Sequence, residues 1–294
     1  MLHEIVNAVG KALEVILPFD CMQFTFIQKA LIGLLLITPL AAITGVQVVN
    51  SRMAFFSDAI GHSAFAGVAF GLLFVVSPNL TMPLLALVVG LAIMALRRGT
   101  RLSSDTVIGV IFSAVVAFGM AVVSRNKSLA RDAQMFLYGD ILTIDDTQII
   151  LLVLLFIAFA VFQFFAYNRL LCISVNPQLA SVHRIRVGLY QYMFAALLSL
   201  VVIFSVRAIG VILVTALLVV PAATARNIAN NTRSMFFLAL ATGLFSAVAG
   251  LLISVQDWVE TATGATIVLV SCVLFTISLV VSLLKGGKTS DTEK

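Results

Sequence analysis

Long apolar stretches, separated by short polar segments, follow one another along the whole chain of 294 residues. A transmembrane helix needs about 20 mostly apolar residues to cross a bilayer. Because one of the candidate stretches is short and only Arg207 separates two others, we predict eight or nine transmembrane helices. The nine candidates are Ala30–Val49, Met53–Val76, Met82–Leu96, Thr106–Ser124, Gln148–Tyr167, Leu189–Val206, Ala208–Ala225, Met235–Val255 and Gly264–Leu284.

The pattern within these stretches favours helices over a membrane barrel. Barrel strands alternate apolar and polar residues over about ten positions, and the stretches lack that alternation. In hydrocarbon the backbone must satisfy its own hydrogen bonds, which leaves the α-helix. We predict an all-α polytopic membrane protein with one transmembrane domain at residues 23–285. Residues 1–22 are expected to form an amphipathic segment at the membrane surface, and residues 286–294 a polar cytoplasmic tail.

Composition and charge agree with this class. Hydrophobic residues make up 61% of the chain, charged residues 11%, and the mean hydropathy is +1.14. The net charge of +5 comes from basic loops, which prefer the cytoplasm. With nine spans, the segments 97–101, 168–186, 225–233 and 285–294 fall on one side. The basic segment 125–132 falls on the opposite side and is the exception. No basic and aromatic surface points to a nucleic acid partner.

The sequence carries no signature of a hydrolase or a nucleotide site. "GGKTS" at Gly286–Ser290 resembles the end of a phosphate-binding loop, but Ser282 stands where that loop needs its first glycine. The GxSxG and HExxH motifs are absent. The cysteines are scattered without CxxC spacing, so we expect them to pack. We predict that the chain is not an enzyme and holds no permanently bound cofactor.

One apolar stretch, "FFSDAIGHSAFAGVAFG", carries an aspartate and a histidine. Asp58 and His62 are four residues apart, so they lie about 40° apart around a helix and share a face. Gly67 and Gly71 form a GxxxG pattern on roughly the opposite face, and such small residues let two membrane helices approach closely. We expect one face of this helix to pack against a neighbour and the other to hold the polar pair.

Spacing alone leaves three roles open for this pair. A charged residue in mid-membrane costs at least about 2.5 kcal/mol on insertion scales, and such residues often mark a pathway. A carboxylate oxygen and an imidazole nitrogen suit manganese, zinc or iron(II), and they suit copper(I) poorly. The pair could equally relay protons, or join two helices through a hydrogen bond.

Further motifs occur in a fixed order along the chain. They are "VVNSRMAFFSDAIGHSAFAGVAFG", "FLYGDILTI" at 136–144, "AIGVILVTALLVVPAATAR" at 208–226 and "TGATIVLVSCVLF" at 263–275. In the same order they resemble the GDALSHA-like segment, the FGDIL segment, the PAATA helix and the closing SGATIVLV helix of one family. That family comprises the permeases of zinc, manganese and iron uptake ABC transporters, and the resemblance extends from about Pro18 to Leu284.

The resemblance implies the permease subunit of an importer that moves a divalent transition metal (manganese, zinc or iron) across the bacterial inner membrane. The implied partners are cytoplasmic ATPase subunits, an extracytoplasmic metal-binding protein and a second permease subunit, identical or a sister. The metal contacts of the family map onto Asp58 and His62. Ser57, Gly61 and Phe65 depart from the family's Gly, Ser and Pro, and none of these changes removes a potential ligand.

The loop "NPQLASVHRIRVG" at 176–188 is similar to a cytoplasmic segment of the family, DPEFAKVLGI, which we interpret as the element that docks on the ATPase. It is more basic than usual, so an acidic groove on the partner is expected. The alternative is that its cations only anchor the cytoplasmic face. The candidate coupling residues are Asn176, Pro177, Gln178, Leu179, Ala180, His183, Arg184 and Arg186.

Two donors do not fill a coordination shell. Glu260, Asp257 and Asp140, near the expected outer face, are therefore further candidate metal contacts. The main competing function is a secondary carrier driven by protons or membrane potential, with Asp58 and His62 as the proton relay. Stand-alone carriers often contain inverted repeats, and the sequence shows no second SDxxxH-like segment.

Overall fold

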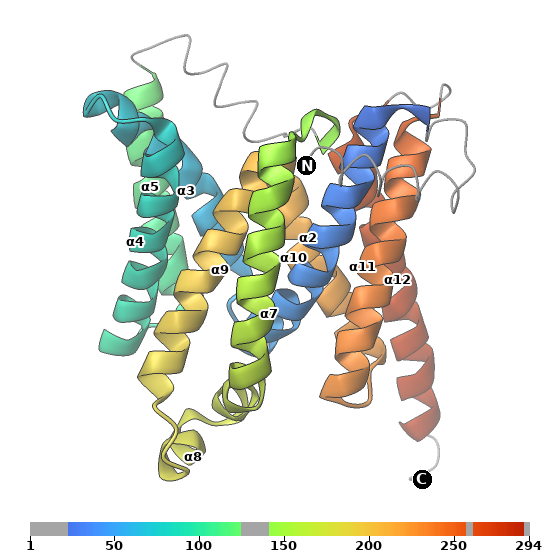
Figure 1. Ribbon diagram of the computed structural model, residues 1–294. Coiled ribbons are helices and arrows are strands. Elements are labelled where there is room, and N and C mark those ends of the chain that lie inside the picture. Colours follow the sequence, from blue (N-terminus) through green and yellow to red (C-terminus); the bar gives the residue numbers. More distant parts are fainter. Residues whose placement is uncertain (1–22, 125–140, 257–260, 291–294) are drawn as a thin grey trace.

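Nine long α-helices run through residues 23–124, 141–256 and 261–290, the part of the chain that the computed structural model describes (Figure 1). This part holds no strand, which confirms the predicted all-α class. Two short elements, η2 (Ile141–Thr143) and α8 (Pro177–Val182), precede and follow α7. The long helices are α2 (Thr25–Asn50), α3 (Ala54–Leu73), α4 (Pro78–Gly99), α5 (Ser104–Val123), α7 (Asp146–Val175), α9 (Val187–Ile209), α10 (Val211–Ile228), α11 (Thr232–Ser254) and α12 (Thr263–Ser290).

The number of membrane spans agrees with the prediction of eight or nine. Among the described residues, eight helices are long and apolar enough to cross a membrane by length and composition. The ninth long helix is α3, which has 20 residues and packs against α4 and α5. The short candidate Met82–Leu96 is the interior of the 22-residue α4, whose first turn begins with Pro78.

The boundary between α9 and α10 differs from the predicted one. The sequence indicated a break at Arg207, whereas α9 continues to Ile209 and α10 starts at Val211. The break falls at Gly210 because this residue has a φ of 85°, which glycine adopts without the steric cost that a Cβ atom brings. Arg207 stays in the last turn of α9 and donates a hydrogen bond to Asn79 Oδ1 at 2.9 Å.

The helices form two groups that three further helices connect. One group contains α3, α4 and α5, on the left of Figure 1. The other contains α10, near the centre of the figure, and α11 and α12, on its right. α2 packs against α10, α11 and α7, while α9 packs against α4 and α7. α2 is the most enclosed span, with 72% of its most apolar window buried, whereas α12 has 17% and α5 has 22%. The apolar outer surfaces of α5 and α12 are therefore available to lipid or to another subunit.

The predicted close packing of the GxxxG face of α3 is confirmed. A Cβ atom added to Gly67 would lie 2.7 Å from Met82 Cα, and one added to Gly71 would lie 2.7 Å from Thr81 Oγ1. Both contacts are shorter than a side chain tolerates, so only glycine lets α3 approach α4 this closely. The packing fixes the rotation of α3 about its axis, and hence the direction in which its opposite face points.

The helix order brings most of the basic connections to the end of the molecule that carries α8 (Figure 1). The connections α4–α5, α7–α9 and α10–α11 all meet there, and by the positive-inside rule this end faces the cytoplasm. α12 extends to Ser290, so it includes the first residues of the predicted polar tail. The predicted amphipathic segment 1–22 and the basic segment 125–132 lie outside the described residues.

Candidate metal-pathway site

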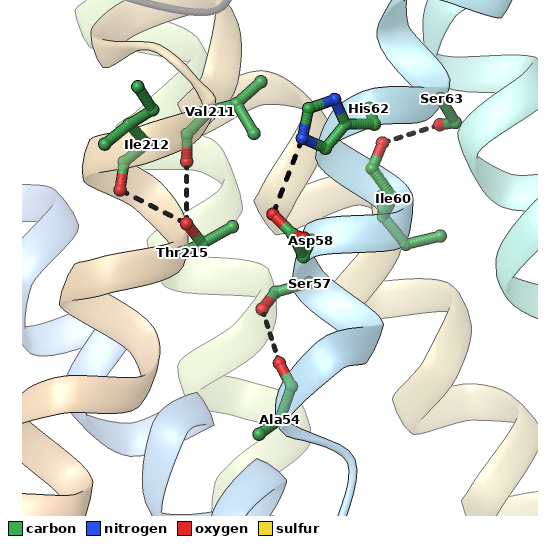
Figure 2. A network of polar contacts seen from close by, with 9 residues as sticks. All are labelled: Ala54, Ser57, Asp58, Ile60, His62, Ser63, Val211, Ile212 and Thr215. Atoms are coloured by element: carbon green, nitrogen blue, oxygen red, sulfur yellow. Dashed lines mark hydrogen bonds and ion pairs between the residues drawn. The ribbon is translucent and has the colours of Figure 1, made fainter. Parts of the chain in front are cut away.

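Asp58 and His62 lie on one face of α3, as their spacing predicts (Figure 2). The distance between Asp58 Oδ1 and His62 Nε2 is 3.7 Å, which is too long for a hydrogen bond. In the isolated chain the Asp58 side chain is 39% exposed and the His62 side chain 23%. Both donor atoms therefore remain free for a third partner, which argues against a pair whose only role is to bond to each other.

The separation of these atoms fits two neighbouring positions in a metal coordination shell. Ligand distances of about 2.1 Å and tetrahedral geometry place two donors about 3.4 Å apart, and right-angle octahedral positions place them about 3.0 Å apart. The observed 3.7 Å lies within a small side-chain rotation of both values. The described residues contain no cluster of three or more His, Cys, Asp or Glu side chains that could hold a metal ion. The geometry of the pair would therefore suit part of a coordination shell.

The His62 ring is held by aromatic neighbours. Phe112 on α5 meets it edge-on, with ring centroids 5.2 Å apart and an interplanar angle of 85°, and Phe65 lies 6.0 Å away on α3. Edge-to-face packing of this kind stabilises one ring orientation. The sequence offered no signal for Phe112, because only the tertiary packing of α5 against α3 brings it to the pair.

The first turn of α10 closes another side of the site. A Cβ atom on Gly61 would lie 2.8 Å from Val211 Cγ1. The glycine, which stands where the family motif has serine, therefore allows α10 to approach this closely. Thr215, one turn further along α10, donates its hydroxyl to Val211 O at 3.1 Å, with Ile212 O at 3.2 Å (Figure 2). Its oxygen lone pairs remain unused by these contacts. Thr215 belongs to the PAATA-like segment, but its place at this site could not be read from the sequence.

Asp140, Asp257 and Glu260, the other candidate metal contacts, lie outside the described residues. Among the described residues, the predicted metal contacts that lie together are Asp58 and His62.

The loop predicted to dock on an ATPase forms α8, which projects beyond the other helices at the cytoplasmic end (Figure 1). Asn176 caps this helix, since its Oδ1 accepts hydrogen bonds from the backbone N–H of Gln178 at 2.9 Å and of Leu179 at 3.2 Å. Ala180 is fully buried against the bundle, while the Leu179 side chain is 56% exposed. A short helix is thus anchored on one side and free on the other.

The cations of this loop follow α8 directly. His183, Arg184 and Arg186 are exposed, and Arg184 has a φ of 58°, a left-handed conformation that turns the chain from α8 towards α9. Exposed Leu179 and Val182 on the helix stand next to these charges. The surface therefore combines an apolar patch with a basic rim, which is the usual composition of a protein–protein contact.

A polytopic helical bundle that holds a partly enclosed carboxylate–imidazole pair on one of its helices is typical of a membrane transport protein. The model of one family, the ABC 3 transport family, matches residues 23–282, and the chain belongs to this family. As predicted, it is therefore an ABC transporter permease, a multi-pass protein of the bacterial inner membrane.

The relatives cover nearly the full length of the chain. The high-affinity zinc uptake system membrane protein ZnuB of Haemophilus influenzae is 31% identical over 87% of this chain and 98% of its own. The manganese transport system membrane protein MntC of Halalkalibacterium halodurans is 29% identical over 91% of each chain. The solved structure of PsaBC from Streptococcus pneumoniae in complex with Fab matches with a TM-score of 0.73, at 28% identity over 95% of each chain.

Proposed function

We propose that this permease carries a divalent transition metal, manganese, zinc or iron(II), into the bacterial cytoplasm, and that Asp58 and His62 contact the ion during passage. The observation that carries the proposal is the free oxygen–nitrogen pair of donors, 3.7 Å apart, on the open face of α3. Family membership and the zinc- and manganese-transport names of the relatives support the choice of ion.

A second permease subunit, identical or a sister, completes the pathway in this proposal. Two observations support it. The Asp58 side chain is partly exposed in the isolated chain, and the Asp58–His62 pair offers two donors, whereas a divalent ion in a protein takes four or more ligands. A facing copy would bring a second oxygen–nitrogen pair and make four donors. Thr215 and any remaining water can supply further oxygen ligands, which manganese and iron(II) accept more readily than zinc.

The energy for transport comes, in this proposal, from ATP hydrolysis on separate cytoplasmic subunits that dock on α8. The capped helix with its exposed Leu179, Arg184 and Arg186 supports this role. An extracytoplasmic metal-binding protein delivers the ion to the opposite end of the bundle. The permease itself needs no resident cofactor in this scheme, since the metal is its cargo.

Reconstitution tests the proposal directly. The purified chain, its ATPase and its binding protein are placed in vesicles, and uptake of manganese, zinc and iron(II) is measured separately. We expect ATP-dependent uptake of at least one of these ions and no uptake with a non-hydrolysable ATP analogue. Uptake that follows an imposed proton gradient without ATP would contradict the proposal and favour the secondary carrier instead.

A further inference from the structure

A groove on the surface of the bundle, between α7 and α11, lies apart from the metal pathway. It has a volume of about 450 Å³ and is lined by α2, α7 and α11, none of which supplies a residue to the Asp58–His62 site. Its walls are mainly apolar, with Phe164, Phe236 and Phe237 among them. The Phe164 side chain is 84% exposed and the Phe237 side chain 57%, so the groove opens towards the lipid.

A buried glutamine lies in this apolar groove. Gln163 on α7 lines it and is only 8% exposed, and neither its Oε1 nor its Nε2 has a hydrogen-bond partner. A buried polar group without a partner costs about 1–3 kcal/mol, and an apolar residue of similar size would avoid that cost. The unpaired amide therefore points to a ligand that enters the groove and supplies the missing hydrogen bonds.

The cytoplasmic end of the groove is positively charged. Arg233 lines it, is exposed, and pairs with no acidic residue in the described part of the chain. It is the second residue of α11, where the positive end of the helix dipole disfavours a cation. The charge thus gains nothing from its own helix, whereas an anion bound beside Arg233 and Asn168 would be stabilised by both the arginine and the dipole.

Asn168 and Gln163 lie at depths in the membrane that match the phosphate and ester groups of a phospholipid. Asn168 and Gln163 are five residues apart on α7, a rise of about 7.5 Å. The polar layer of a bilayer is about 5–8 Å thick on each side, so a phosphate at the level of Asn168 places the ester groups near Gln163. The phenylalanines line the groove at about the level of Gln163, and Ala160, three residues further along α7, continues it deeper into the membrane. A volume near 450 Å³ is within the range of ligand sites, about 300–1,000 Å³.

We propose that this groove binds an anionic glycerophospholipid of the cytoplasmic leaflet. Its phosphate contacts Arg233 and Asn168, and an acyl chain lies against Phe164 and Phe237. The Gln163 amide, which is covered in the lipid-free chain, turns into the groove, and its Nε2 donates a hydrogen bond to an ester carbonyl. This choice of a lipid over a second permease rests on the proposed function, in which the second subunit faces the metal pair on α3: α3 packs against α4, α5, α9 and α10 and makes no extensive contact with α7 or α11, the main walls of the groove.

A neighbouring groove provides a matched control. It lies between α7 and α9, has a volume of about 350 Å³ and is lined by apolar side chains and Tyr190. Arg169, next to Asn168 on α7, lies over the Tyr190 ring at 5.2 Å and donates to its hydroxyl. This arginine is at the same depth as the headgroup end of the proposed site, yet it is already engaged. Its replacement should therefore leave lipid binding unchanged.

Native mass spectrometry of the purified, delipidated full chain tests the proposal. Phosphatidylglycerol and phosphatidylcholine with identical acyl chains are titrated in turn. We expect preferential binding of one phosphatidylglycerol, and Arg233→Gln should weaken it about fivefold, the effect of one basic residue at an anionic surface. Arg233→Lys should retain most of the preference, and Arg169→Gln all of it. Equal affinity of Arg233→Gln and the parent, or an equal loss in Arg169→Gln, would overturn the proposal.

Gln163→Leu separates a lipid contact from a structural role. It should lower phosphatidylglycerol affinity about fivefold through the lost hydrogen bond, while the lipid-free variant melts no lower than the parent. A variant that melts lower and binds lipid normally would show that Gln163 serves packing, against the proposal. Photo-crosslinking from Phe237→benzoylphenylalanine in membranes identifies the occupant: a lipid adduct supports the proposal, and a covalent dimer of the chain refutes it.

Discussion

Replacement of Asp58 by asparagine changes one charge at the site and almost nothing else. Asparagine has the same shape as aspartate and still offers a carbonyl oxygen and hydrogen-bonding capacity. The Asp58–His62 contact, at 3.7 Å, is an i, i+4 pair of the kind that contributes about 0.3–0.5 kcal/mol. We therefore expect Asp58→Asn to insert, fold and assemble like the parent protein.

The expected loss of transport follows from electrostatics. Two unit charges about 4 Å apart attract by about 1 kcal/mol in water and about 4 kcal/mol at an effective dielectric constant of 20. A divalent cation doubles both values, to about 2 and 8 kcal/mol. Because the Asp58 side chain is 39% exposed in the isolated chain, we use the lower value as the minimum. A loss of about 2 kcal/mol slows passage about 30-fold.

The assay is ATP-driven metal uptake into vesicles that contain the complete importer, normalised to the amount of assembled complex. Asp105→Asn is the control, since Asp105 is an exposed acid in the first turn of α5, remote in sequence from the pair. We expect normal uptake by this control. Normal uptake by Asp58→Asn would refute the metal-pathway role. Loss of assembly in Asp58→Asn would instead indicate a structural pair.

Three further predictions concern packing and coupling. Gly67→Ala should lower the free energy of unfolding by about 1–3 kcal/mol, the cost of overpacking, because its Cβ would meet the α4 backbone. Gly109→Ala is the control and should not lower it, since nothing lies within 4 Å of the added Cβ. Thermal melting compares the two variants, and equal melting temperatures would contradict the prediction. Arg184→Glu should weaken co-purification of the ATPase about fivefold at low salt, and this difference should fade at high salt. Arg101→Glu is the control and should have little effect. A loss of co-purification that does not depend on salt would contradict an electrostatic contact. Asn176→Ala should destabilise α8 by about 1 kcal/mol and lower transport-coupled ATP hydrolysis, and Asn176→Asp should restore it; equal hydrolysis by both variants would exclude a role for the cap.

The helices could be predicted from the sequence because the bilayer imposes one requirement, an apolar run of sufficient length. The exact ends could not be, since they depend on local backbone geometry. Gly210 ends α9 through its positive φ, whereas Arg207 reaches Asn79 from within the helix and so does not interrupt it. The short helix α8 was expected only as a loop, because six residues show no periodicity.

The candidate site also has one part that the sequence predicts and one part that it does not. The common face of Asp58 and His62 follows from helical periodicity alone, and the structure has it. The neighbours Phe112 and Val211 come from helices far away in the sequence, and only packing brings them to the pair. Gln163 in its groove is a similar case, because a lone glutamine in an apolar helix carries no sign of the groove it lines.

An ion that is transported must be released as well as bound, and the small number of donors on α3 bears on both steps. A complete protein site for zinc binds with about 10–16 kcal/mol. Binding of about 12 kcal/mol is nanomolar, and at a diffusion-limited association rate of about 10⁹ M⁻¹s⁻¹ release then takes about a second or longer. In the proposed function, a site assembled from two facing Asp58–His62 pairs would avoid so slow a release. If the two subunits separate at the pathway, the ion would keep at most one oxygen and one nitrogen donor from this pair, and its affinity would fall. The close packing of α3 on α4 through Gly67 and Gly71 favours this mechanism, because the Asp58–His62 pair would then move with its own subunit and could not follow the ion.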